Sequence, residues 1–151
     1  MDALKSNPFL TEVESLLKVL GIDVNKAKQV VPNGILFYFS FKELPVYVCL
    51  PSTLPSDYSN TSRIEVEVAC LDAVTAGHLI YTIGLYLDMN DCSPIRVIPR
   101  THGPKVKIII QFVCNLLLLQ PTTLAETIIH CCDLSDYIKE NLIEKKKVNA
   151  S

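Results

Sequence analysis

The sequence predicts an α+β domain in which an antiparallel sheet of about five strands is packed by helices, in the order α-β-β-β-α-β-β-α. Three segments repeat apolar residues at the helical period, and the runs between them are short, apolar or alternating, which is typical of strands. The 151 residues are 49% apolar and 20% charged, enough to build one core. We therefore expect a single domain over residues 1–151, frayed at 1–8 and 148–151.

The first helix is predicted over Thr11–Leu20. Thr11 and Glu14 have the spacing of a capping box, and Gly21 follows where a C-terminal cap would lie. The apolar residues at helical spacing are Val13, Leu16, Leu17 and Leu20. They form one stripe, which needs another surface to cover it.

Three strands are predicted next. Ile35–Phe39 and Val46–Leu50 should form an antiparallel hairpin around the turn residues 42–45, and residues 51–62 should form a loop. The third strand, Arg63–Cys70, alternates. One face carries Ile64, Val66, Val68 and Cys70, and the other carries Arg63, Glu65 and Glu67. The charged face should be at least partly in contact with water.

A second helix is predicted over Thr75–Asn90, and its apolar side comprises Leu79, Ile80, Ile83, Tyr86 and Leu87. Two strands should follow, Ile95–Ile98 and about Val106–Val113, with strong turn chemistry at residues 99–104. Periodicity leaves Leu116–Leu119 open, since this run either extends the last strand or begins a buried connection.

The last helix is predicted from Thr123 to about Ile143. Thr123 and Glu126 again have capping-box spacing. The helical stripe is formed by Leu124, Ile128, Cys131, Leu134, Ile138 and Leu142. Three lysines at 145–147 suit the negative end of this helix.

The charge balance and the absence of targeting patterns argue against a nucleic-acid-binding, secreted or membrane protein. Fourteen basic and sixteen acidic residues give a net charge of −2, without the basic excess of a nucleic-acid binder. The N-terminal residues do not resemble a signal peptide, and the apolar run 106–119 is too short and too polar to span a bilayer. Six cysteines in this context favour reduced thiols over disulfides. We expect a cytoplasmic or nuclear protein that does not bind membranes.

No familiar catalytic or cofactor pattern is present, so we predict a non-enzymatic protein without a metal site or a cofactor. His130, Cys131 and Cys132 are adjacent in a predicted helix and point about 100° apart, which disfavours a shared metal ion. Cys92 is the best candidate nucleophile, with His102 as its base. A helix C-terminus, however, raises rather than lowers the pKa of a thiol.

Two families show resemblances. The segment from Phe9 to Asn90 resembles the RWD domain, a non-catalytic relative of ubiquitin-conjugating enzymes. Leu54-Pro55-Ser56-Asp57-Tyr58-Ser59 is similar to that family's Leu-Pro-x-x-Tyr-Pro loop, although Ser59 replaces the final proline. The closing helix is similar to the family's last helix. This resemblance implies an adaptor or a subunit of a larger complex.

The second resemblance covers the whole chain. The order α-β-β-β-α-β-β-α is that of the type III secretion chaperone-like fold, which includes YbjN-type proteins. Residues 16–21 (LLKVLG) look like the opening helix of that family. Six cysteines and only mild acidity depart from its acidic bacterial chaperones. This resemblance implies a homodimer that holds a partner chain.

The prediction is therefore a protein-interaction module, with an RWD-like adaptor or subunit as the first interpretation and a chaperone-like homodimer as the alternative. A Cys-dependent enzyme is a distant third. The expected partner is another protein, in an obligate hetero-complex or a homodimer. The predicted protein-binding residues are Leu54, Pro55 and Tyr58 in the loop, and Ile108 and Ile110 in the late apolar run. An exposed edge strand that accepts a partner segment by β-augmentation is a further candidate surface.

Overall fold

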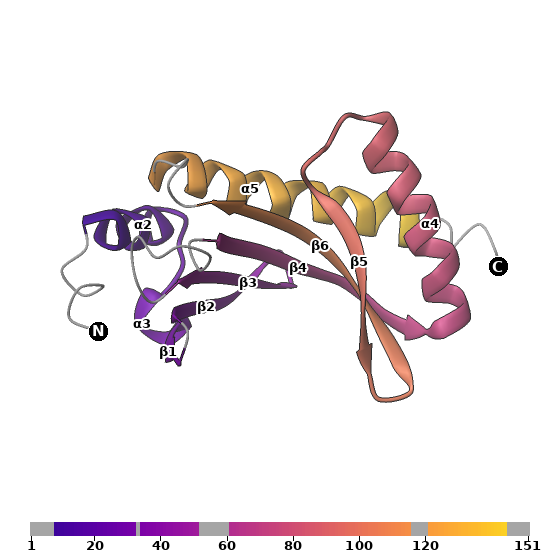
Figure 1. Cartoon of the computed structure of the whole chain (residues 1–151), viewed down its shortest axis with the longest axis horizontal. Helices are drawn as coiled ribbons and strands as arrows, with labels where there is room; N and C mark the ends of the chain where they lie inside the picture. The colour runs from indigo at the N-terminus through magenta and orange to yellow at the C-terminus, as the bar shows by residue number, and fades with distance from the viewer. Residues whose placement is uncertain (1–7, 33, 52–60, 116–120, 145–151) are drawn as a thin grey trace.

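The computed structural model describes residues 8–32, 34–51, 61–115 and 121–144. A six-stranded, fully antiparallel sheet has the strand order β1-β2-β3-β4-β6-β5. The helices α2, α4 and α5 lie against one face of this sheet (Figure 1). The α+β class and the predicted antiparallel sheet are confirmed.

The elements in chain order are α2 (Pro8–Val19), α3 (Val24–Ala27), β1 (Lys28–Val31), β2 (Gly34–Phe41), β3 (Leu44–Pro51), β4 (Thr61–Asp72), α4 (Ala73–Met89), β5 (Arg96–His102), β6 (Lys105–Asn115), α5 (Pro121–Ile138) and the π-helix η2 (Lys139–Glu144). The predicted order holds for the longer elements. The sheet has one strand more than expected, because β1 was not predicted.

Strand β1 and helix α3 are short, and both were missed. Each consists of four residues, which are too few to show a hydrophobic periodicity. The side chain of Asp23 caps α3, with its Oδ1 3.4 Å from the backbone N of Lys26. β1 then pairs with β2 at the edge of the sheet. The ion pair between Lys28 and Glu14, 2.7 Å long, connects this edge to α2.

Both predicted capping boxes are wrong, because each helix starts earlier. α2 begins at Pro8, which was expected to be frayed, and α5 begins at Pro121. Proline is favoured in the first turn of a helix, since its missing N–H would have no partner there. Thr11 and Thr123 therefore lie inside their helices. The predicted C-terminal cap at Gly21 is correct: its φ is 84°, and the Ile22 N–H donates to the Leu17 carbonyl at 3.1 Å.

Helix α4 buries the side that the sequence predicted. Ala76, Leu79, Ile83 and Leu87 face the core. Its true cap is Asp72, whose Oδ1 accepts a hydrogen bond from the Thr75 N–H at 2.9 Å. The helix therefore starts directly after β4, two residues before the predicted boundary.

Strand β4 contains a β-bulge between Glu67 and Ala69. An extra residue reverses the alternation beyond it. Cys70, predicted on the apolar face, instead pairs with Lys107 and shares its face. The strand also continues to Asp72, beyond the predicted end at Cys70.

The late hairpin is longer than predicted. Strand β5 runs to His102, so Pro99 lies in an edge strand, where the missing N–H of proline is tolerated. The turn is confined to Gly103 and Pro104, and Gly103 has a φ of 59°. A glycine first in a two-residue hairpin turn is typical of type II′. The first hairpin is also tighter than predicted, with Lys42 and Glu43 alone between β2 and β3.

The core lies between the sheet and its helices. Ile108 and Ile110 on β6 are fully buried in this core, together with Leu124, Ile128 and Cys131 on α5. Strand β6 lies between β4 and β5, which explains why its middle residues are buried on both faces. The run 116–119, left open by the periodicity, lies outside the described residues.

Candidate protein-binding surfaces

The sheet face opposite α2, α4 and α5, called the open face below, carries a polar row across five strands. The register pairs Tyr38 with Tyr47, Tyr47 with Glu65, Glu65 with Gln111, and Gln111 with Arg96. Paired residues point to the same side of a sheet, so these five side chains lie side by side. The row connects β2 to β5 through the centre of the sheet.

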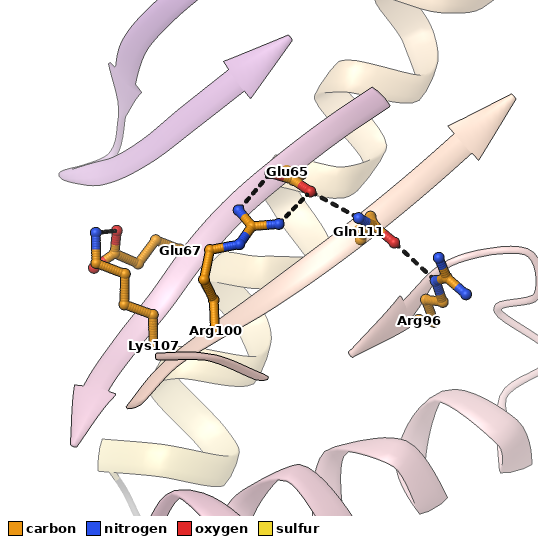
Figure 2. Close-up of polar contacts among 6 residues, drawn as sticks. All are labelled: Glu65, Glu67, Arg96, Arg100, Lys107 and Gln111. Carbon is orange, nitrogen blue, oxygen red and sulfur yellow. Dashed lines mark hydrogen bonds and ion pairs between the residues drawn. The ribbon is translucent and has the colours of Figure 1, made fainter. Parts of the chain in front are cut away.

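Glu65 is the centre of this row (Figure 2). Its two carboxylate oxygens accept hydrogen bonds from Arg100, at 2.8 Å from Nη1 and 3.0 Å from Nη2. Gln111 Nε2 donates to Glu65 Oε2 at 2.7 Å, and Arg96 Nε donates to Gln111 Oε1 at 2.8 Å. Three donors from two strands thus hold one carboxylate. The charged face of β4 is thus only partly in contact with water, as expected: Arg63 is exposed, whereas the Glu65 side chain is 6% exposed.

These contacts also change the acidity of Glu65. The hydrogen bonds from Arg100 lower its pKa below the ordinary value of 4.5, assisted by Gln111 and the positive charges of Arg100 and Arg63, while burial opposes the effect. The carboxylate is therefore ionised at neutral pH although it is buried. On the same row, the rings of Tyr38 and Tyr47 stack at 4.7 Å.

The open face has a positive charge balance. Register and ion pairs place on it the cations Arg63, Arg96, Arg100, Lys105 and Lys107, and the carboxylates Glu65, Glu67 and Asp72. Lys107 pairs with Glu67 at 3.4 Å (Figure 2). The face therefore has a net charge of +2, whereas the whole chain has −2.

A second surface is the outer side of α4. The four apolar side chains Val74, Tyr81, Leu85 and Met89, called the α4 stripe below, are 73%, 70%, 45% and 81% exposed. At about 100° per residue they fall within about 80° of arc on one side of the helix. α4 is thus apolar both toward the core and away from it, which is typical of a helix that meets a second partner.

The predicted binding residues are distributed differently. Leu54, Pro55 and Tyr58 lie outside the described residues. Ile108 and Ile110 are fully buried in the core, between the sheet and the helices, so they stabilise the fold and present no surface.

The structure does not bring the considered nucleophile and base together. Cys92 lies three residues beyond Met89, the last residue of α4, and its thiol lies 3.7 Å from the Asn90 carbonyl oxygen. β5 starts four residues later and extends for about 20 Å, so that His102 lies at its far end. Cys131 and Cys132 are both buried in α5, and burial raises the pKa of the Cys132 thiol to about 12. Such a thiol stays protonated and unreactive.

Within the described ranges, no three histidine, cysteine or acidic residues gather closely enough to hold a metal ion. The cysteines whose side chains are described, Cys49, Cys70, Cys92, Cys131 and Cys132, are free thiols. No helix in this part of the chain is long and apolar enough to cross a membrane.

Two features went unpredicted. The α4 stripe was visible in the sequence, because Val74, Tyr81, Leu85 and Met89 recur at helical spacing opposite the predicted core side. The partners of Glu65 were not visible. Arg100 is 35 residues away and meets Glu65 across the intervening strand β6.

The fold is similar to that of a chain in the crystal structure of the ExsC–ExsE complex. The TM-score is 0.55, and the match covers 87% of this chain and 94% of that chain. Sequence identity is 13%, so the similarity concerns the fold. No protein-family model matches the sequence, and no curated protein is significantly similar to it.

The observed order of elements agrees with the second resemblance, the type III secretion chaperone-like fold. The RWD resemblance is not supported. It covered Phe9–Asn90 and the closing helix, whereas the sheet here is completed by β5 and β6, which lie between those two segments.

Proposed function

We propose that this protein is a non-enzymatic, chaperone-like module that forms a homodimer and holds an extended segment of a partner protein. The observation that carries the proposal is the α4 stripe, whose apolar side chains stay exposed while the opposite side of the helix is buried. Exposed apolar residues that follow one helix face are typical of an interface. A second copy of the same helix is the occupant that we propose.

A dimer through α4 is consistent with the geometry of the helix. The stripe extends over 16 residues of α4, or about 22 Å along the axis. Two copies related by a two-fold axis would each present the same residues to the other. The open face belongs to the opposite side of the sheet, so this arrangement leaves it available to another chain.

The fold supports a role in protein binding. The ExsC–ExsE structure, whose title names a complex of two proteins, contains a chain of the same fold. The free thiols of the described cysteines suit a reducing compartment such as the cytoplasm. The buried, protonated thiol of Cys132 and the separation of Cys92 from His102 give no support to Cys-dependent catalysis.

Light scattering on the purified chain tests the dimer. We expect a mass of twice 16.8 kDa at micromolar concentrations, and a mass of 16.8 kDa for the variant Leu85→Glu. Leu85 is 45% exposed, so a glutamate there can reach water in the monomer but would be buried in the dimer. Circular dichroism would confirm that the variant is folded.

Val19→Glu is the matched control. Val19 is 81% exposed and lies on α2, away from the α4 stripe, so this variant should remain dimeric. A monomeric wild-type chain would contradict the proposed dimer. A Leu85→Glu variant that keeps the dimer mass would assign the interface to another surface.

A further inference from the structure

We propose that the open face of the sheet binds an extended, acidic segment of a partner protein, with Arg63 and Arg96 as its main contacts. This inference rests on the proposed partner-holding role and adds the chemistry of the partner. It does not depend on the dimer. It follows from the charges on the open face, their ion pairs, and the spacing of the strands.

The charge of the open face is not balanced within the described residues. Arg100 is engaged by both oxygens of Glu65, and Lys107 is paired with Glu67. Arg63 and Arg96 are exposed, and none of the described ion pairs joins either of them to a carboxylate. Arg96 uses its Nε for Gln111, and the two terminal nitrogens of its guanidinium point away from Gln111 (Figure 2).

The hydrogen bond to Gln111 preorganises the Arg96 guanidinium for binding a carboxylate. Because one edge of the guanidinium is fixed by the row Glu65–Gln111–Arg96, less side-chain freedom is lost when a carboxylate binds its other edge. Glu65 has no capacity to be that carboxylate, since Arg100 and Gln111 occupy it. The other edge of the Arg96 guanidinium can therefore bind a carboxylate that belongs to a partner protein.

The spacing of the two arginines suits an extended chain. Arg63 on β4 pairs with Val113, and Arg96 on β5 pairs with Gln111, so they are separated by two strand spacings and two residues. Standard strand dimensions place their Cα atoms about 12 Å apart. Acidic residues at alternate positions of an extended segment, about 7 Å or 13 Å apart, can each reach one guanidinium. The stacked Tyr38 and Tyr47 offer an apolar contact further along the same row.

A protein segment fits this face better than a nucleic acid does. Glu65 and Glu67 lie between the cations, and a continuous run of phosphates would pass over both carboxylates. The net charge of +2 is also small for a surface that must neutralise a nucleic-acid backbone. An acidic peptide can place neutral side chains over the carboxylates and acidic ones over Arg63 and Arg96.

Selection from a displayed library of random 12-residue peptides tests the inference. We expect the full-length wild-type protein to enrich aspartate and glutamate. The enriched peptide, labelled and measured by fluorescence anisotropy, should bind about tenfold more weakly to the variant Arg63→Glu/Arg96→Glu and more weakly at high salt. The same peptide with its acidic residues replaced by amides should lose affinity for the wild type to a similar degree.

Lys18→Glu/Lys26→Glu is the matched control. Both lysines are exposed, lie on α2 and α3, and change the net charge by the same amount. Binding by this variant should stay within about twofold of the wild type, because exposed charges beyond a Debye length are screened. Leu85→Glu should also retain peptide binding, which separates this face from the proposed dimer.

Three results would overturn the inference. Enriched peptides without an acidic bias would leave the partner-holding role in place and exclude this partner chemistry. Selection of no peptide at all would overturn both. Binding of a labelled single-stranded 12-nucleotide RNA more tightly than the acidic peptide, with loss in Arg63→Glu/Arg96→Glu, would assign the face to nucleic acid.

Discussion

Glu65 is a buried carboxylate whose charge is balanced by donors from two other strands. Its bidentate pair with Arg100 has the geometry of a strong, charge-assisted interaction. Arg100 itself is 44% exposed, so the pair lies at a boundary between the sheet and water. Such a pair stabilises less than its geometry suggests, but its carboxylate is costly to leave without a partner.

Removing Arg100 should therefore destabilise the fold. We expect Arg100→Ala to lower the free energy of unfolding by about 1–3 kcal/mol, because Glu65 keeps only Gln111 as a donor. Urea denaturation of Arg100→Ala, Glu65→Gln and the double variant measures the coupling between the two side chains. The loss in the double variant should be smaller than the two single losses together, whereas additive losses would show that the two groups do not interact.

The lowered pKa of Glu65 makes stability depend on acid. Above the ordinary pKa of 4.5, the carboxylate is ionised in both folded and unfolded chains, and its stabilising contribution is complete. As the pH falls below that value, the unfolded chain takes up the proton first, so the contribution is lost until the pH has passed through the lower, folded pKa. In Arg100→Ala the pKa of Glu65 in the folded chain should rise. The protein should then lose less of its stability through Glu65 as the pH falls.

Urea denaturation at a series of pH values, together with an NMR titration of the Glu65 carboxyl carbon, measures both effects. An unchanged Glu65 pKa in Arg100→Ala would show that burial and Gln111 dominate its acidity instead. Arg96→Ala is a suitable control, since Arg96 contacts Gln111 rather than the carboxylate.

Strand β6 organises the sheet because it is central, with β4 on one side and β5 on the other. Its residues Ile108, Ile109 and Ile110 are all buried, although neighbours in a strand point to opposite faces. Helices cover Ile108 and Ile110, whereas Ile109 lies on the open face. The strand is thus part of the core on one side and the base of the polar row on the other.

Ile110→Ala tests the structural role of β6. We expect it to lower the free energy of unfolding by about 2–5 kcal/mol, as for other fully buried isoleucines that leave a cavity. Urea denaturation is the measurement. The control Val19→Ala, at a position that is 81% exposed, should stay within about 0.5 kcal/mol of the wild type. An Ile110→Ala chain of unchanged stability would contradict its place in the core.

The molecule has three distinct outer regions. The helical layer covers one side of the sheet (Figure 1). The open face carries a net charge of +2, and the apolar side chains of the α4 stripe are exposed. The two candidate interfaces are different in chemistry and belong to opposite sides of the sheet. A homodimer through α4 and a partner segment on the open face are therefore compatible, and variants of one should not affect the other.

Local features of this protein were predictable from the chain. The stripes of α2, α4 and α5, the hairpin of β2 and β3 and the cap at Gly21 depend on residues within one or two turns or strands of each other. Their periods are therefore visible in consecutive residues. Helix starts were less predictable, since Pro8 and Pro121 compete with the nearby threonines as starting points.

The sites depended on contacts between distant residues. Glu65 and Glu67 looked alike on an alternating strand, but only Glu65 is covered by Arg100 and Gln111, which are 35 and 46 residues away. The bulge in β4 moved Cys70 to the other face, and the position of β6 buried Ile108 and Ile110. Local periodicity specifies which residues avoid water, whereas strand order and register determine which charges meet.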